Sequence, residues 1–282
     1  MAVVRRVGIM FSGGTDSAYA VLSQLPKYDE VHLVSFIRTG LRKIDNPDGM
    51  VRRFRDTFPG KLITYEQYDC EAIYTALTPH EEKRQAQERV LNGGIEPLWE
   101  HPHGVGGTRE QYDADKVTLF MANECLQCKI AMHIAALKWC REHDIDQLCD
   151  GGNIEQLDDA SQLEDVKKIA QALFARNGVN YYSPVLHVSE DERCRALFEA
   201  GITEHRTHKK LEKNHKIPSN QIQCTVPASV LWTMCVFPWL VYDAQSCSEY
   251  VDMCCNYYGH EMEKWLEAVA LDAWQLPKLR EI

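Results

Sequence analysis

A glycine-rich loop near the start of the chain has the residue types that bind phosphate. Gly13 and Gly14 remove the side chains that would keep a phosphate away from the backbone. An expected helix follows them, and its unpaired N–H groups and positive dipole end attract anions. Hydroxyl groups flank the glycines at Ser12, Thr15 and Ser17. The loop therefore predicts a cradle for the phosphates of a nucleotide, and in particular for pyrophosphate.

The same loop differs from two other kinds of nucleotide site. It lacks the lysine that follows the glycines of a Walker A loop, and it lacks the G-x-G-x-x-G spacing of a dinucleotide-binding fold. The six residues from Ser12 to Ser17, SGGTDS, instead resemble the SGGxDS signature of the PP-loop ATP pyrophosphatase superfamily. Members of that superfamily split ATP into AMP and pyrophosphate to activate an oxygen atom of their substrate.

The resemblance implies further contacts around the loop. ATP would bind with Mg²⁺ on its phosphates, and Asp16 would lie near the metal or its waters. Phe36 and Ile37, in the second expected strand, would offer backbone groups to adenine, and Gly151, in a second glycine turn, would also contact the nucleotide. An acidic residue in the first turn of a helix stabilises that helix by itself, so a structural role for Asp16 stays open.

Two cysteines begin a later expected helix. Cys125 and Cys128 are separated by two residues, so their thiols can chelate one metal, form a redox pair or supply a nucleophile. Lys129, directly after the pair, can reach a phosphate or a substrate anion as a point charge. The spacing alone does not choose among these chemistries, and exposure to solvent is the alternative for Lys129.

A more distant cysteine, Cys224, completes a layout that resembles one branch of the superfamily. A close cysteine pair followed by a distant third is similar to the PP-loop sulfur transferases, such as tRNA 2-thiolation enzymes, that hold a 4Fe–4S cluster with three thiolates. Three further blocks agree with this branch in order and rough spacing. They are DGGN at 150–153, YYSPVL at 181–186 and QCTVPAS at 223–229.

This resemblance implies a set of metal ligands and catalytic residues. Cys125, Cys128 and Cys224 would bind the cluster, and zinc is the less favoured metal. Cys128 and Cys224, together with Asp16 and Lys129, would be the catalytic residues. The alternatives are a catalytic cysteine pair without metal, or thiols that only pack in the core. Packing is also expected for the other eight cysteines, namely Cys70, Cys140, Cys149, Cys194, Cys235, Cys247, Cys254 and Cys255.

Three functions compete on these grounds. The leading one is an AMP-forming ATP pyrophosphatase that attaches AMP to a carbonyl or carboxyl oxygen and then replaces it with sulfur. The second is the amide- or nitrile-forming ligase chemistry of 7-cyano-7-deazaguanine synthases, whose N-terminal motif is similar. Those enzymes carry a four-cysteine zinc loop, and this sequence has no close-spaced quartet. The third is a nucleotide-binding module without turnover.

Composition favours some partners over others. The formal net charge of -10 argues against broad binding to polyanions, because Lys and Arg supply most of the affinity for nucleic acid. We therefore expect a small-molecule or protein substrate, with tRNA as the alternative and the basic segment from His205 to Lys216 as its candidate surface. A homodimer is also compatible with the sequence. The absence of a long apolar run or a leader pattern predicts a cytoplasmic protein without a membrane partner.

The elements that position these residues alternate between strands and helices. Val3–Phe11 and Val31–Ile37 have the short, β-branched character of buried strands, and a helix from Asp16 to Leu25 joins them. Helices are expected again at 128–142 and 163–177, with a strand at 147–149 between them. This order predicts an α/β fold, a doubly wound and mostly parallel sheet of the HUP or Rossmann-like type with a mainly helical C-terminal region.

The sequence also predicts two domains. Residues 1–228 would form the PP-loop domain, and residues 229–282 would form a helical extension. Within the first domain, the stretch at about 40–123 shows no regular hydrophobic period and is expected to be an insertion that faces the substrate.

Overall fold

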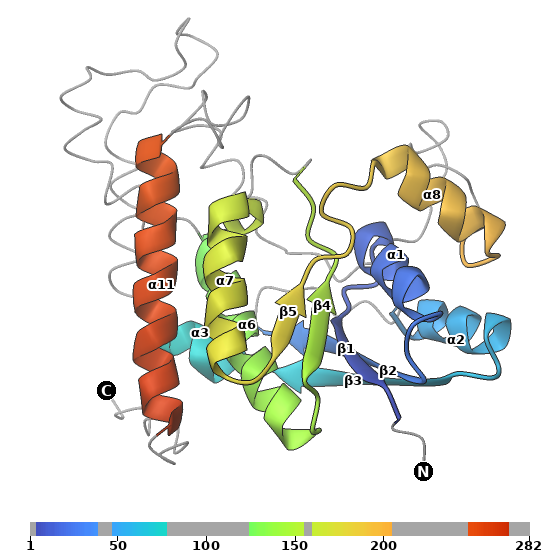
Figure 1. Ribbon diagram of the computed structural model, residues 1–282, viewed down its shortest axis with the longest axis horizontal. Coiled ribbons are helices and arrows are strands. Elements are labelled where there is room, and N and C mark those ends of the chain that lie inside the picture. The colour runs from blue at the N-terminus through green and yellow to red at the C-terminus, as the bar shows by residue number, and fades with distance from the viewer. Residues whose placement is uncertain (1–3, 39–46, 78–123, 155–159, 205–247, 271–282) are drawn as a thin grey trace, which may run out of the picture. The chain divides into compact units, whose positions relative to one another are not determined.

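The computed structural model is built of alternating strands and helices (Figure 1). The residues that it describes are 4–38, 47–77, 124–154, 160–204 and 248–270. The chain forms two compact units that interleave along the sequence. The first unit comprises 1–69, 135–155 and 174–225, and the second comprises 70–134, 156–173 and 226–282.

A five-stranded parallel sheet lies at the centre of the first unit. Its strands are β1 (Arg6–Met10), β2 (Glu30–Ile37), β3 (Leu62–Asp69), β4 (Gln147–Asp150) and β5 (Asn180–Tyr182). Their order is β3-β2-β1-β4-β5, so the chain proceeds outward from β1 to β3 and then returns to the other side of β1. In open α/β sheets, ligands bind at the carboxyl ends of the strands where the order reverses, which is between β1 and β4 in this sheet.

Three helices of the first unit cover one face of this sheet (Figure 1). They are α1 (Thr15–Gln24), α2 (Pro47–Thr57) and α8 (Glu190–Glu199). Alternate residues of β1, Val7 and Ile9, point toward these helices and are fully buried with Val21 of α1, Phe54 of α2 and Leu197 of α8. The period of two in β1 and the apolar faces of the helices thus build one continuous core.

The opposite face of the sheet is covered by the ends of two longer helices, α6 (Glu124–Glu142) and α7 (Glu164–Arg176). Trp139 of α6 lies directly on Gly8 of β1, where an added β carbon would come within 2.6 Å of the indole ring. The ring of Phe174 in α7 stacks on Tyr181 of β5 at 4.7 Å. Helices on both faces of a parallel sheet confirm the doubly wound α/β fold expected from the sequence.

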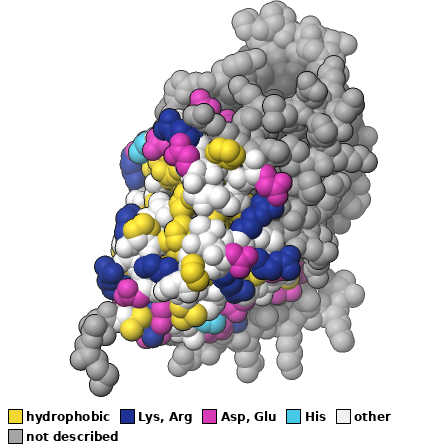
Figure 2. All heavy atoms as spheres, turned by 90° about the vertical axis from the view of Figure 1, so that its right-hand side faces the viewer, with side chains coloured by type: hydrophobic (Ala, Val, Ile, Leu, Met, Phe, Trp, Pro, Cys, Tyr) yellow, Lys and Arg dark blue, Asp and Glu magenta, His cyan; other side chains and the backbone are white. Residues whose placement is uncertain are grey.

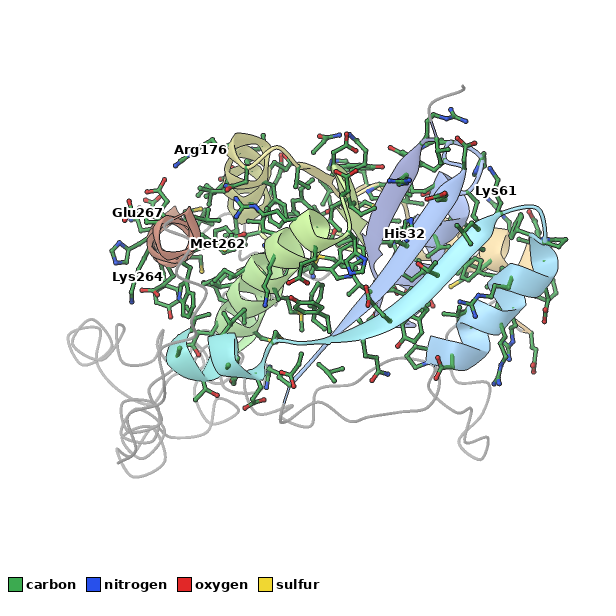
Figure 3. All side chains as sticks on the ribbon, turned by 90° about the horizontal axis from the view of Figure 1, so that it is seen from below. His32, Lys61, Arg176, Met262, Lys264 and Glu267 are labelled. Carbon is green, nitrogen blue, oxygen red and sulfur yellow. The ribbon has the colours of Figure 1, made fainter. Side chains whose placement is uncertain are left out.

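Two elements of the sheet region were not expected. Helix α2 and strand β3 lie within the stretch at 40–123, for which the sequence showed no regular period. β3 is an edge strand of the described sheet, so several of its side chains are polar and make cross-strand contacts. Thr64 Oγ1 lies 2.9 Å from His32 Nδ1, and Lys61, just before β3, donates to the Tyr28 carbonyl at 2.7 Å (Figure 3).

The second unit is helical in its described parts. It contains α3 (Glu71–Leu77), the first part of α6, a 3-10 turn at Ala160–Gln162 with most of α7, and α11 (Ser248–Ala270). On α11, Met262 is buried, whereas Lys264 and Glu267 point to solvent (Figure 3). α11 supports the expectation of a mainly helical C-terminal region, and the boundary at residue 229 stays a prediction. Among the described helices, none combines the length and apolar character needed to cross a membrane.

Candidate nucleotide site

The loop between β1 and α1 has the backbone shape of an anion cradle. Gly13 has a φ of 77°, a left-handed conformation that glycine adopts without steric cost. Gly14 then occupies the N-cap of α1 and has no side chain of its own to cap the helix. These N–H groups and the positive end of the helix dipole are the features that bind phosphate groups.

Two serines brace the loop from inside. Ser12 Oγ lies 3.2 Å from Ser17 Oγ and accepts a hydrogen bond from the Gly14 N–H at 3.3 Å. Ser17 Oγ donates to the Gly14 carbonyl at 2.9 Å. Both hydroxyls thus hold the shape of the loop, and their use as phosphate donors, like that of Thr15, stays a prediction.

Asp16, in the first turn of α1, is held by two residues from distant parts of the chain. Asn153, in the loop after β4, donates from Nδ2 to one carboxylate oxygen at 2.8 Å. Arg193 of α8 forms an ion pair with the other oxygen, with Nε at 2.8 Å. The Arg193 side chain is only 4% exposed, and that of Asp16 is 26% exposed. The carboxylate is therefore fixed in place yet remains accessible from the solvent side.

The turn that follows β4 packs against the start of α1. A β carbon added to Gly151 would lie 2.5 Å from the backbone nitrogen of Ser17, so only glycine fits at this position. The preceding residue, Asp150, is buried and accepts hydrogen bonds from the Gly152 N–H at 3.0 Å and from the Tyr181 hydroxyl at 2.7 Å. Its carboxylate also accepts a hydrogen bond from Ser183 Oγ.

The structure thus brings together three of the sequence blocks singled out above. SGGTDS and DGGN contact each other through Gly151 and Asn153, and YYSPVL supports the DGGN turn through the hydroxyls of Tyr181 and Ser183. The participation of Gly151 in nucleotide binding stays a prediction, but its place beside Ser17 is now explained by steric need.

The end of β2 lies next to this loop. β1 ends at Met10 opposite Val34, and the N–H of Phe11 donates to the Val34 carbonyl at 2.8 Å. β2 continues to Ile37 in register with β3, and the ring of Phe36 packs edge to face on Tyr68 at 6.0 Å. The backbone at Phe36 and Ile37 therefore extends beyond the end of β1, where we predicted adenine to bind, and that contact stays a prediction.

The expected cysteine site is described only in part. Cys128 is buried in α6, and Lys129 beside it is half-buried. The side chain of Cys125 and the whole of Cys224 lie outside the described residues, as does the basic segment at 205–216. Among the described residues, no group of three or more His, Cys, Asp or Glu side chains is arranged to hold a metal ion. The three-cysteine site therefore stays a prediction.

The other described cysteines are reduced and poorly suited to nucleophilic attack. Burial raises the pKa of Cys140 to about 12 and holds the pKa of Cys149 well above its usual range. The pKa of Cys255 is also raised, first by burial and then by the carboxylates of Asp165 and Asp252. Since the thiolate is the reactive form, a raised pKa lowers the reactivity of these three thiols at neutral pH. Burial agrees with the packing role expected for Cys70, Cys140, Cys149, Cys194 and Cys254.

Arg193 is a site residue that sequence reasoning missed. In α8 it shares the buried face of the helix with Leu197, four residues later. An arginine at an apolar position of a helix rarely lacks a charged partner, because a buried charge must be paired. That periodicity was the available signal, and the partner is Asp16.

No family model and no curated protein matches this chain. Solved structures resemble it at low identity. A predicted subunit of a tRNA methyltransferase from Methanocaldococcus jannaschii is 14% identical with a TM-score of 0.36, over 70% of this chain and 75% of that one. A 4-thiouridine synthetase in complex with RNA and with bound ATP is 13% identical with a TM-score of 0.40, over 94% of this chain and 54% of that one. The chain thus spans about half the length of that synthetase.

A third solved structure is the U34-tRNA thiolase NcsA from Methanococcus maripaludis with its 4Fe–4S cluster. It is 15% identical with a TM-score of 0.33, over 92% of this chain and 72% of that one.

Proposed function

We propose that this protein binds ATP at the loop between β1 and α1 and transfers AMP to an oxygen atom of a substrate, with release of pyrophosphate. The observation that carries this proposal is the arrangement of the loop. Gly13 and Gly14 expose the N-terminus of α1, Gly151 closes against it, and Asp16 is anchored at its first turn. Such an arrangement stabilises charge that develops on a departing pyrophosphate.

In this reaction the substrate oxygen attacks the α-phosphorus of ATP, and the bond from that phosphorus to the bridging oxygen breaks. The electron pair of that bond leaves with pyrophosphate. The backbone N–H groups at the start of α1 would hold the pyrophosphate oxygens throughout, and their fixed geometry would avoid reorganisation in the transition state. Positioning and charge stabilisation therefore account for the chemistry that the loop performs.

The donor set at the loop fits Mg²⁺. This ion prefers oxygen ligands and is usually bound by one or two carboxylates together with substrate phosphates. The Asp16 carboxylate is partly exposed at the first turn of α1, so it would face the metal directly or through a water molecule. When bound, Mg²⁺ neutralises charge on the phosphates.

We further propose that sulfur replaces the activated oxygen, which leaves as AMP. The cysteine pair at 125 and 128 and the distant Cys224 favour sulfur over nitrogen as the incoming atom. Formation of an amide or nitrile is the alternative, and the sequence lacks the close-spaced cysteine quartet expected for it. A 4Fe–4S cluster on these thiolates is part of the proposal.

The favoured acceptor is a small molecule or a protein, with tRNA as the alternative. The net charge of -10 disfavours a polyanion. The face of the molecule shown in Figure 2 carries basic and acidic side chains interspersed, rather than gathered by sign, over its described part. A polyanionic acceptor would therefore depend on another surface.

Release of pyrophosphate tests the ATP half of the proposal. The protein would be incubated with ATP, Mg²⁺ and candidate acceptors, and pyrophosphate and AMP would be quantified. Asp16→Ala should abolish turnover without loss of the fold, as judged by circular dichroism. Asp48→Ala is the matched control, because Asp48 also lies in the first turn of a helix, α2, and is exposed. Turnover of Asp16→Ala near the wild-type rate would contradict the assignment.

Iron analysis tests the sulfur half. After anaerobic purification, replacement of Cys125, Cys128 or Cys224 by Ala should remove iron and sulfur transfer together, while ATP binding persists. Cys140→Ala and Cys194→Ala are controls that should change neither, since both thiols are buried. Sulfur transfer that persists in the triple variant would reject the cysteine site, and turnover that requires ammonia would favour the alternative.

A further inference from the structure

The proposed phosphate site includes a negative charge at its entrance. From Ser12 to Ser17 the only ionisable residue is Asp16, and no Lys or Arg accompanies it within that loop. Asp16 lies in the first turn of α1, where the helix N–H groups would meet pyrophosphate. An uncompensated carboxylate at this place would repel a ligand that carries several negative charges, since two like charges a few ångströms apart repel strongly near a protein surface.

Arg193 is placed to cancel that charge. Its Nε lies 2.8 Å from a carboxylate oxygen of Asp16, and its side chain is almost fully buried. The guanidinium is also held from behind, because its Nη1 donates to the Val188 carbonyl. The start of α8 is in turn fixed by Ser189, whose hydroxyl accepts from the Glu192 N–H at 3.3 Å.

A second contact aligns α8 with α1. Tyr19 lies one helical turn after Asp16 and faces Glu192, the residue before Arg193. Burial raises the pKa of Tyr19, and the charge of Glu192 and its hydrogen bond to the phenol raise that pKa further. Tyr19 thus remains a neutral phenol beside the Glu192 carboxylate. The first turn of α8 therefore contacts α1 at two successive turns, which fixes the guanidinium of Arg193 opposite Asp16.

We propose that Arg193 is a positioning residue of the phosphate site, which compensates the charge of Asp16 so that the loop accepts pyrophosphate and the phosphates of ATP. This inference rests on the proposed function, because it takes the ligand of the loop to be a polyphosphate. Arg193 acts through Asp16 rather than by contact with the ligand. It differs in this from the lysine of a Walker A loop, which reaches the phosphates itself.

A double-mutant cycle of Arg193 and Asp16 tests this role, with inorganic pyrophosphate as the ligand. Its affinity would be measured by calorimetry, with a chelator present so that no metal contributes. Arg193→Met leaves the carboxylate uncompensated and should weaken binding about tenfold or more. Asp16→Asn leaves the guanidinium uncompensated and should tighten binding. The double variant restores neutrality and should return to within about threefold of the wild-type affinity.

The cycle separates charge compensation from plain structural support. If Arg193 only held α8 in place, the double variant would bind as weakly as Arg193→Met, and this result would overturn the inference. Unchanged affinity in Arg193→Met would overturn it as well. Arg195→Met is the matched control, because Arg195 lies on the exposed side of the same helix and should have no effect.

Two further comparisons distinguish a failure of this inference from misfolding and from a failure of the proposed function. If Arg193→Met does not fold, the step from Asp16→Asn to the double variant still removes the same guanidinium, and it should weaken binding. If wild-type protein binds neither pyrophosphate nor ATP, the proposed function itself is wrong. If wild-type protein binds and the double variant does not recover, the proposed function stands and the role of Arg193 is wrong.

Discussion

Two turns with paired glycines follow neighbouring strands of the sheet and differ in what they hold. After β1, the loop with Gly13 and Gly14 leads into α1 and presents helix N–H groups. After β4, the turn with Gly151 and Gly152 closes around Asp150, which is buried and accepts hydrogen bonds from a backbone N–H and two hydroxyls. The first turn leads into a helix N-terminus where we propose that phosphate binds, whereas the carboxylate of the second turn is bonded within the protein.

Asp16 and Asp150, the aspartates of the two turns, differ in exposure and in their partners. Asp16 is partly exposed and paired with a cation, whereas Asp150 is buried and bound by neutral donors. The two glycine turns therefore differ in the surroundings of their acidic residue, which is a cation and partial exposure for Asp16 and hydroxyl and backbone donors with burial for Asp150.

The largest effect is expected at Gly13. Valine at this position would have to adopt a φ of 77°, and it would place a side chain where the phosphates approach. We expect Gly13→Val to reduce ATP-dependent pyrophosphate release by about 100-fold or more, as when a charge-stabilising donor is lost. Gly178→Val is the control, since Gly178 has a similar φ of 78° in open space, and it should reduce stability but not turnover.

The next effect concerns the contact between the two turns. Gly151→Ala would push a methyl group against the backbone of Ser17, which cannot move aside without distorting α1. We expect a loss of about 1–3 kcal/mol in the free energy of unfolding, together with weaker ATP binding. Gly60→Ala adds the same methyl group in open space and should do neither. Normal ATP affinity in Gly151→Ala would show that the second turn does not support the first.

Asp150→Asn should separate stability from function. Replacing the carboxylate weakens its bonds to the hydroxyls of Tyr181 and Ser183, and we expect a cost of about 1–3 kcal/mol in chemical denaturation. Because Asp150 faces the protein, the ATP affinity of the folded fraction should stay within about threefold of wild type. An affinity loss as large as that of Arg193→Met would mean that both turns face the ligand.

The smallest expected effect is on the free energy of unfolding at alkaline pH, and it comes from a thiol near the end of β4. Cys149 precedes Asp150, and burial, followed by the charge of Asp150, keeps its pKa raised in the folded state. The unfolded thiol ionises near pH 8.5, so the stabilisation is complete below that pH and is lost as the pH rises above it. Cys149→Ala should lessen this decline by at most about 1.4 kcal/mol per pH unit.

Unfolding curves between pH 8 and 10 would measure this decline. Ile9 occupies the register position opposite Cys149 in β1, so the turn after β1 has no titrating thiol at the corresponding place. Cys255→Ala, at a half-buried thiol, should change the slope of the free energy of unfolding against pH less than Cys149→Ala does. Equal slopes in wild type and Cys149→Ala would contradict the prediction.

The first βαβ unit and its loop could be predicted because local patterns specify them. Residues 7–10 of β1 and 33–36 of β2 are buried without a break and are mostly apolar, and the glycines of the loop are required by backbone geometry. β3 was missed because its position at the sheet edge allows Glu66 and Gln67 within the strand, which masks the apolar period. α2 was missed because a glycine and five charged residues obscure the buried face formed by Met50, Val51 and Phe54.

The site could be predicted only where its residues form a contiguous sequence motif. The glycines and Asp16 form a contiguous motif, whereas Asn153 and Arg193 reach Asp16 from after β4 and from α8. Such pairs depend on strand order, and no spacing along the chain encodes the position of β4 beside β1. The tertiary contact therefore had to come from the structure.

The strand order determines when, during synthesis of the chain, the residues around Asp16 can come together. β1 pairs with β4, and Asp16 bonds to Asn153, which lies 137 residues further along the chain. At a ribosomal speed of about 5–20 residues per second, the phosphate loop emerges many seconds before its partners do. A nascent chain thus carries the SGGTDS motif without Gly151, Asn153 or Arg193 to complete it. If the loop binds ATP as proposed, we expect tight binding only after α8 has been synthesised, so that ATP would stabilise the completed protein rather than guide its early folding.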